Sequence, residues 1–316
     1  MDYDFQPHRI IEIYPITEPE EPKKDIISLI KKANKKLSNK QKLLSLTLFL
    51  ATFITTTFIG GVDYISFYKL DYGILDLRFW AGGLWYSIPL MLILASHEMG
   101  HFLTATYYGI DCTPPYFIPA PTLIGTFGAF IKIKSPFLSK KELFDVGIAG
   151  PLAGFIIAVP VLIAGVLLSQ PAPQIINTKD VITFGEPLLY KIIVLFKYGT
   201  TDINLILHPT GFAGWIGLLV TALNLLPVSQ LDGGHISYAV FGKKSFAIAY
   251  GLGAILLILS LFYNGWIIWL VLLIILGIKH PRFFFEEEPL DKKRKILAFI
   301  ALLIFILSFI PIPVKF

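Results

Sequence analysis

Two histidines four residues apart, with a glutamate next to the first, lie in the segment Ser96-His97-Glu98-Met99-Gly100-His101. Residues four apart lie on one face of a helix, so the two imidazoles could hold one metal ion. Glu98 lies about 100° around the helix from His97, beside such an ion but poorly placed to bind it together with both histidines. A carboxylate in this position suits a base that acts on a water at the metal.

A further ligand must come from elsewhere, because a catalytic zinc site uses three protein ligands and leaves one position open. The best candidate is Asp232, in the segment Asn224-Leu-Leu-Pro227-Val-Ser-Gln-Leu-Asp232-Gly233-Gly234. Pro227 interrupts helical hydrogen bonding and the two glycines free the backbone, so the carboxylate could turn towards the histidines. Alone, an Asp-Gly-Gly sequence is more simply interpreted as a turn. The histidine pair is what makes Asp232 a candidate ligand.

The composition indicates a membrane protein. The chain has 316 residues, of which 55% are apolar and 16% charged, and its mean hydropathy is +0.69. This leaves too little polar surface to cover a soluble globule of that size. Six apolar segments have lengths near the roughly 20 residues that span a bilayer, at 43–60, 84–108, 146–168, 212–230, 245–278 and 296–314. Asn264-Gly265 is a turn signal within the fifth segment, so we expect about seven spans.

The histidine motif is expected to lie deep in the second of these spans. At about 1.5 Å per residue, the helix from Leu84 places His97 roughly 20 Å below the outer end. An acid inside a span costs at least about 2.5 kcal/mol on insertion scales. If His97, Glu98 and His101 had only a structural role, other buried partners would have to offset this insertion cost. The cost therefore favours a functional site.

The expected fold class is an all-α polytopic membrane protein with a membrane-associated extended or hairpin segment near 114–134. That segment combines four prolines with alternating polar and apolar residues at 130–134, which is typical of extended backbone. Lipid does not tolerate bare strand edges, so a hairpin here should be buried in protein, line a cavity or lie at the interface. An ordinary interfacial loop is the alternative.

Two domains are expected along the chain. Residues 1–42 are polar and should form a short cytoplasmic segment, and residues 43–316 should form the transmembrane domain, with a catalytic core at about 84–240. Residues 186–198 have the pattern of an amphipathic helix near the membrane surface.

The distribution of lysines argues for membrane topology rather than for nucleic-acid binding. The net charge is +5, and six lysines lie between Lys31 and Lys42, directly before the first span. By the positive-inside rule the N-terminus is cytoplasmic, and seven spans then place the basic segments at 132–141, 243–244 and 279–295 on the same side. We therefore expect a multi-pass protein of the cell membrane, with the lipid bilayer and no nucleic acid as partner. The alternative is that these lysines are simply solvated and do not report the orientation of the chain in the membrane.

Two motifs together resemble the site-2 protease family of intramembrane zinc metalloproteases. They are His97-Glu98-x-x-His101 in one transmembrane segment, and Asn224-x-x-Pro227 with Leu231-Asp232-Gly233 in a later one. The resemblance covers about residues 84–240, and the glycine-rich segment 147–154 resembles a further element of a core helix. The sequence around His208-Pro209 is especially similar to the subgroup with archaeal, cyanobacterial and plastid members.

The resemblance implies that His97, His101 and Asp232 bind one Zn²⁺ per chain, that Glu98 activates water and that Asn224 stabilises an oxyanion. Substrates would be transmembrane proteins, cut within or next to their spans in regulated intramembrane proteolysis. The outer connection at 169–210 is too short for the PDZ domain of some members, and we expect a member of the subgroup without PDZ or CBS domains.

Three other functions fit part of the pattern. A membrane zinc transporter also places histidines and carboxylates in helices, but the sequence lacks a pair of matched broken-helix halves. A prenyl-protein-processing zinc protease shares the histidine motif but takes a glutamate as third ligand. A non-catalytic pseudoprotease scaffold would keep the fold and lack one of the four residues His97, Glu98, His101 or Asp232.

The remaining polar residues have structural interpretations. His208 and His280 are expected at the membrane interface, and Asp145 is expected to complement the dipole at the start of a helix. His235 could support Asp232 by a hydrogen bond from outside the ligand set.

Overall fold

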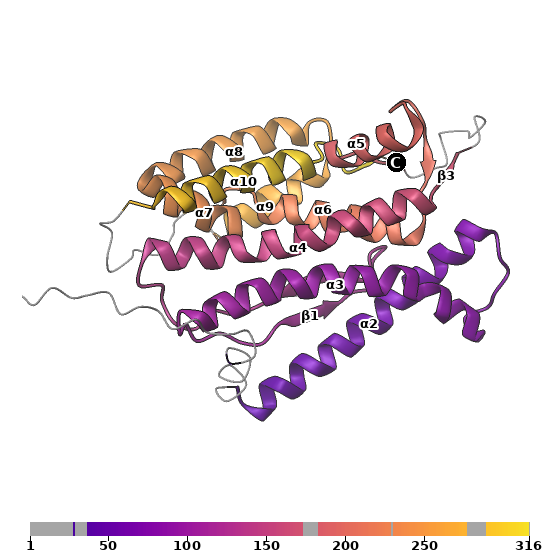
Figure 1. Ribbon diagram of the computed structural model, residues 1–316, viewed down its shortest axis with the longest axis horizontal. Coiled ribbons are helices and arrows are strands. Elements are labelled where there is room, and N and C mark those ends of the chain that lie inside the picture. Colours follow the sequence, from indigo (N-terminus) through magenta and orange to yellow (C-terminus); the bar gives the residue numbers. More distant parts are fainter. Residues whose placement is uncertain (1–27, 29–36, 173–182, 229, 277–288, 316) are drawn as a thin grey trace, which may run out of the picture.

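The computed structural model describes Ser28 and residues 37–172, 183–228, 230–276 and 289–315. Helices dominate this part of the chain, and Figure 1 shows their arrangement. They are α2 (Asn39–Tyr68), α3 (Leu77–Tyr107), α4 (Lys140–Leu168), α5 (Leu188–Tyr198), α6 (Pro209–Asn224), α7 (Asp232–Phe241), the 3-10 turn η2 (Gly242–Lys244), α8 (Ser245–Ser260), α9 (Gly265–Leu276) and α10 (Lys292–Ser308).

Short antiparallel strands join some of these helices. The longest pair is a hairpin of β1 (Tyr116–Pro119) and β2 (Thr126–Phe130), in which Phe117 pairs with Ala129. This hairpin confirms the extended segment predicted near 114–134. The described residues hold two further pairs, β3 (Gln170–Pro171) with β5 (Leu205–Ile206) and β4 (Thr183–Phe184) with β6 (Val314–Lys315).

Four helical stretches are long and apolar enough to cross a membrane, namely Asn39–Tyr68, Leu77–Tyr107, Lys140–Leu168 and Asp232–Ser260. The last joins α7, η2 and α8, and Gly242 interrupts it with φ at +58°. The helices α6 and α10 occupy other predicted apolar segments but have 16 and 17 residues, and α9 is described over 12 residues, up to Leu276. The chain is thus a helical membrane protein, while the count of about seven spans is not confirmed.

Two predicted local features are confirmed by the helix boundaries. The segment 245–278 is divided into α8 and α9 by the turn that contains Asn264. The amphipathic helix predicted at 186–198 is present as α5. The polar segment 1–42 lies largely outside the described residues.

Glycines bring α2 and α3 into close contact. A Cβ atom on Gly60 would lie 2.4 Å from the Gly83 carbonyl oxygen, and one on Gly83 would lie 2.1 Å from the Thr57 carbonyl oxygen. The buried Thr57 hydroxyl also donates a hydrogen bond to Ser87 Oγ at 2.9 Å. Small residues allow helix backbones to approach closely in lipid, where packing rather than water exclusion holds helices together. The first two long helices therefore form one unit.

The hairpin is attached to α2 by hydrogen bonds from side chains to backbone carbonyl groups. Ser45 Oγ donates to the Pro115 oxygen at 2.6 Å, before β1, and Thr55 Oγ1 donates to the Gly125 oxygen at 2.7 Å, in the turn. Figure 1 shows β1 between α2 and α3. These two bonds tie the chain on both sides of β1 to one helix, so α2 fixes the position of the hairpin.

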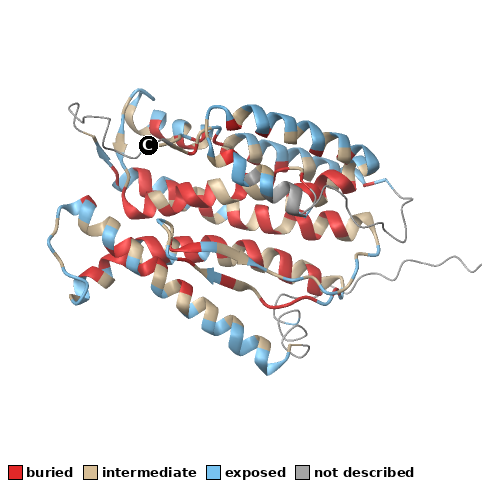
Figure 2. Cartoon of the chain, turned by 180° about the vertical axis from the view of Figure 1, so that it is seen from behind, coloured by how far each residue is buried: buried red, intermediate tan, exposed pale blue. Residues whose placement is uncertain are grey.

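The helix α4 lies between α3 and α6 and carries much of the buried core (Figure 2). Leu162 is fully buried, and a Cβ atom on Gly165 would lie 2.1 Å from the Gly211 Cα in α6. In contrast, α8 and α9 leave large apolar side chains exposed, among them Leu257 at 60% and Ile268 at 72%. Such outward-facing apolar side chains fit contact with lipid.

His208 is a buried side chain that joins α2, α3 and α6. It forms the N-cap of α6, where its Nδ1 accepts a hydrogen bond from the Thr210 backbone N–H at 3.2 Å. The ring packs edge-on against Phe67, Tyr68 and Trp85, with centroids 5.2, 6.1 and 5.6 Å away. Burial lowers the pKa of His208, because removal from water disfavours the charged imidazolium.

We expect His208 to make the protein less stable as the pH falls from about 7 to about 5. Its pKa in the folded state lies below the unfolded value of about 6.5, so its stabilising contribution is full above about pH 6.5 and is lost as the pH falls through the folded pKa. Asparagine keeps a capping oxygen and takes up no proton in this range. The change in Tm between the two pH values should be smaller in His208→Asn than in wild type, and equal changes would contradict this role.

Candidate metal centre

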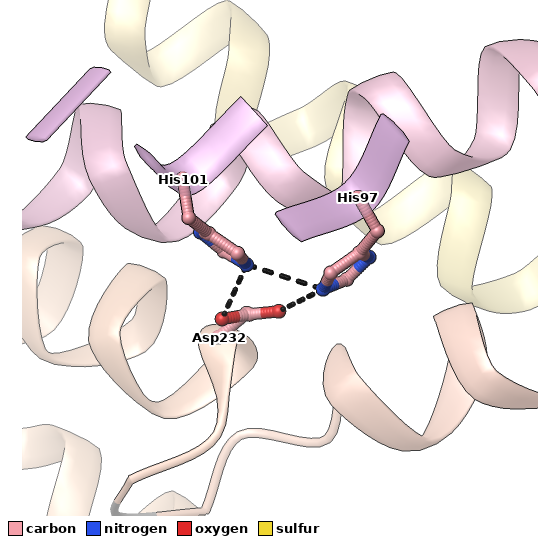
Figure 3. Close-up of side chains that lie close together, drawn as sticks. All are labelled: His97, His101 and Asp232. Atoms are coloured by element: carbon pink, nitrogen blue, oxygen red, sulfur yellow. Dashed lines mark hydrogen bonds and ion pairs between the residues drawn. The ribbon is translucent and has the colours of Figure 1, made fainter. Parts of the chain in front are cut away.

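His97 and His101 lie on one face of α3, as their spacing predicts. Both are buried, at 4% and 7% exposure. Their Nε2 atoms are 3.1 Å apart and point towards the same space (Figure 3). Because both side chains belong to one rigid helix, the helix itself sets the distance between them.

Asp232 completes the cluster from a different part of the chain. It is the first residue of α7, and its carboxylate lies between the two imidazoles (Figure 3). Its Oδ2 is 3.2 Å from His97 Nε2 and its Oδ1 is 3.3 Å from His101 Nε2. The chain reaches this position by ending α6 at Asn224 and folding tightly, since a Cβ atom on Gly233 would lie 2.0 Å from the Leu225 carbonyl oxygen.

These three residues fit a tetrahedral zinc ion. Zinc binds imidazole nitrogen and carboxylate oxygen at about 2.0–2.2 Å, which places two ligand atoms of a tetrahedron about 3.3 Å apart. The three distances between ligand atoms are 3.1, 3.2 and 3.3 Å. His97, His101 and Asp232 are the group of potential ligands that comes together in the described part of the chain.

The hydrogen bonding of His101 also suits a metal ligand. Its Nδ1 lies 2.7 Å from the Val146 backbone oxygen in α4. A carbonyl oxygen only accepts, so Nδ1 carries the hydrogen and the lone pair is on Nε2, which faces Asp232. Metal-binding histidines usually donate their other ring N–H in this way, and the bond fixes the ring.

Glu98 is buried next to these ligands, at 6% exposure. The backbone N–H of Ile131, directly after β2, donates a hydrogen bond to its carboxylate. The charges of His97, His101 and Asp232 all act on this carboxylate. Glu98 is outside the cluster of ligand atoms, so the structure holds it beside the centre, between the ligands and the hairpin.

Asn224 reaches the edge of the centre as well. It is the last residue of α6, and its Nδ2 lies 3.2 Å from His97 Nε2. All five predicted site residues are therefore brought together. His235 follows Asp232 by one turn of α7, and its ring lies 6.0 Å from the Phe137 ring.

Glycines of α4 make room for the histidines. A Cβ atom on Gly150 would lie 2.0 Å from His101 Nε2, and one on Gly154 would lie 3.3 Å from His97 Nδ1. On α3, a Cβ atom on Gly100 would lie 2.4 Å from the Ala149 oxygen. The glycine-rich segment 147–154 was noted in the sequence without a role for its members. The spacing of Gly147, Gly150 and Gly154, three and four residues apart, is the signal that could have assigned them to one helix face.

The mutation Gly150→Ala should disturb the metal centre selectively. Its new methyl group would occupy the space of the His101 ring, and overpacking of this kind typically costs about 1–3 kcal/mol. Zinc content measured by elemental analysis should fall below that of wild type, together with the Tm. The matched control is Gly253→Ala in α8, where a Cβ atom meets nothing within 4 Å. A wild-type zinc content in Gly150→Ala would show that the position of the His101 ring does not depend on the space that Gly150 leaves.

Comparison with known proteins gives one family. The model of peptidase family M50 matches residues 85–260, more than half of the chain. The matched segment contains all five residues of the site, from His97 to Asp232. No solved structure matches the chain.

Several plant proteins are similar to the chain. The probable chloroplastic zinc metalloprotease EGY2 of Arabidopsis thaliana is 31% identical over 246 residues, which cover 76% of this chain and 44% of that protein. The probable chloroplastic zinc metalloprotease EGY1 of Oryza sativa subsp. japonica is 37% identical over 161 residues, which cover 49% of this chain and 28% of that protein. The chain spans less than half the length of these curated relatives. Together with the family match, the sequence motifs and the geometry of the site lead to one conclusion: the chain belongs to peptidase family M50, the family of the site-2 proteases.

Proposed function

We propose that the protein is an intramembrane zinc metalloprotease that hydrolyses peptide bonds within or next to transmembrane segments of membrane proteins. The observation that carries this proposal is the convergence of His97, His101 and Asp232 at tetrahedral spacing beside the buried carboxylate of Glu98. Membership of a peptidase family supports it. So do the names of relatives such as EGY2, a probable zinc metalloprotease.

His97, His101 and Asp232 would hold one zinc ion. When bound, zinc acts as a Lewis acid that polarises the substrate carbonyl and makes water a better nucleophile. Glu98 takes a proton from the attacking water and returns it to the leaving nitrogen. The water oxygen forms a bond to the carbonyl carbon, and the carbon–nitrogen bond breaks. Asn224 donates a hydrogen bond from Nδ2 to the oxygen that becomes negative during the attack.

The hairpin offers a means of presenting the substrate. A helical substrate hides its peptide bonds in internal hydrogen bonds, so it must unwind locally before it is cut. An unwound segment could pair as a strand with the hairpin, as extended peptides do with free sheet edges. The bond between Ile131 and Glu98 joins the end of β2 to the proposed base. A strand paired there would lie next to Glu98.

The proposal extends to domains and topology. Residues 43–316 would form the transmembrane protease domain, with its catalytic core at about 84–240 and with residues 1–42 as a cytoplasmic segment. The protein would lie in the cell membrane with its N-terminus and the Lys243-Lys244 turn on the cytoplasmic side, as the lysine distribution indicates. Protease protection of a tag at the N-terminus in sealed vesicles would decide the orientation.

The variants Glu98→Gln and Asp232→Ala should separate catalysis from metal binding. Glu98→Gln should keep about one zinc per chain and lose at least about 100-fold in cleavage of a model transmembrane substrate, the lower range for general-base catalysis. Asp232→Ala should lose zinc, because only two protein ligands remain. Zinc is measured by elemental analysis, and cleavage by gel mobility of the substrate.

Matched controls are available for both variants. Glu186→Gln removes a partly exposed glutamate whose nearest cation, Lys191, is 3.8 Å away, and Asp63→Asn changes another aspartate within a membrane helix. Both should keep wild-type zinc content and cleavage. If the protein binds zinc but shows no cleavage that depends on Glu98, the result would point instead to a zinc transporter or a non-catalytic scaffold.

Strand pairing with the hairpin predicts a periodic response to changes in the substrate backbone. Along a paired strand, alternate N–H groups point towards the partner strand. N-methylation of single amides in a peptide around the cleavage site should therefore slow cleavage strongly at every second position and weakly between them. Rates measured for a series of singly methylated peptides test this. A response without a two-residue period would rule out strand pairing as the mode of binding.

A further inference from the structure

A wide, open cavity of about 990 Å³ lies between the end of α3, the first half of α4 and the start of α10. Its walls are largely apolar, and they include Leu103, Ile148, Leu152 and Leu297. This volume is in the range of pockets that bind small molecules. Since the cavity lies among helices of a membrane protein, an occupant with an apolar chain would fit these walls.

Charged side chains lie at one end of this cavity. Arg294 in α10 donates to both carboxylate oxygens of Asp145, at 2.8 and 2.5 Å, and forms a second ion pair with Asp291. Tyr108 OH also donates to Asp145, at 2.5 Å. Asp145 was expected to complement a helix dipole, but it is the sixth residue of α4 and pairs with Arg294. The guanidinium is satisfied within the protein and is not free to bind a ligand.

The two lysines next to Arg294 differ from it. Lys292 and Lys293 line the same cavity and are exposed. Within the described part of the chain, neither has a carboxylate within ion-pair distance. The lining carries three cations and two carboxylates, hence one net positive charge. Asp291 already caps α10 by accepting from the Arg294 backbone N–H at 3.0 Å, so the lysine side chains are the groups open to an anion.

We propose that this cavity binds a phospholipid with an acidic headgroup. An acyl chain would lie against the leucine and isoleucine walls, and the acidic headgroup would lie at Lys292 and Lys293. The cavity lies where a polar segment becomes the apolar sequence of α10, and it is lined there by Tyr107 and Tyr108. Tyrosines and lysines are the side chains that gather at the headgroup level of a bilayer. A soluble acidic ligand would leave the apolar walls unmatched, and a neutral lipid would leave the lysines unmatched.

The position of the cavity relates the lipid to the metal centre. Ala149 lines the cavity, and its backbone oxygen lies against Gly100, between the two histidines of α3. An acyl chain bound in the cavity would thus pack against the part of α4 that contacts α3 next to His101. The inference does not rest on the proposed proteolysis, because lipid binding is measured without any substrate.

The test uses the full chain, purified in detergent after reconstitution in vesicles of phosphatidylcholine and phosphatidylglycerol. Native mass spectrometry measures which lipid stays bound. We expect retention of one phosphatidylglycerol in preference to phosphatidylcholine. The double variant Lys292→Gln with Lys293→Gln should lower that preference about tenfold or more, since a lysine near an acidic lipid contributes about 1 kcal/mol. The matched control, Lys243→Gln with Lys244→Gln, removes the same charge from two exposed lysines outside the cavity.

A third variant tests the acyl site. Leu297→Trp fills the cavity from α10 and should abolish retention of both lipids, while an unchanged zinc content shows that the protein is folded. Equal preference in the two double variants would overturn the proposal, and so would equal retention of the two lipids by wild type. Lipid retained in Leu297→Trp, or glycerophosphate bound as tightly as the lipid, would show that the cavity holds no acyl chain and would overturn it as well.

Discussion

The contact of the Asp232 carboxylate with two imidazoles is the interaction on which the described structure depends. Two ring nitrogens and a carboxylate lie 3.1–3.3 Å apart in a buried space. Lone pairs this close repel one another unless a cation or a proton lies between them, and removal from water makes the repulsion stronger. The site is therefore stable only if the surrounding helices hold it together and a positive charge completes it. This requirement explains several features that would otherwise lower stability.

The most evident of these features are the glycines. A glycine in a helix costs about 1 kcal/mol relative to alanine, yet Gly150 in α4 and Gly100 in α3 lie where any side chain would collide with the facing helix. In lipid, close backbone approach is itself a source of helix association. The same absence of side chains gives the His101 ring its space. Packing of α3 against α4 and binding of the metal thus depend on the same few positions.

Much of the site could be predicted from the sequence, because its signals are local. The spacing of His97 and His101 fixes their common face, and the proline and glycines around Asp232 indicate a break in the chain. Partners that come from distant segments left no such signal. The Val146 carbonyl that orients His101 and the Ile131 N–H that binds Glu98 are backbone groups, which every residue possesses. Asp145 pairs with Arg294, which lies 149 residues away in the chain. The count of about seven spans stays a prediction, because apolar composition does not determine where a helix ends: α6 and α10 have 16 and 17 residues.

The position of the proposed base is decided far from the metal. Glu98 follows His97 in α3, but its carboxylate is bound by Ile131 at the end of the hairpin. The hairpin is in turn attached to α2 through Ser45 and Thr55. Since α2 is locked to α3 by their glycine contact at Gly60, the base, the hairpin and the first two long helices form a closed loop of contacts. A substrate strand that pairs with the hairpin would therefore be positioned relative to Glu98 by the packing of α2 on α3, whereas Asp232 comes from α7 and His101 is oriented by Val146 of α4.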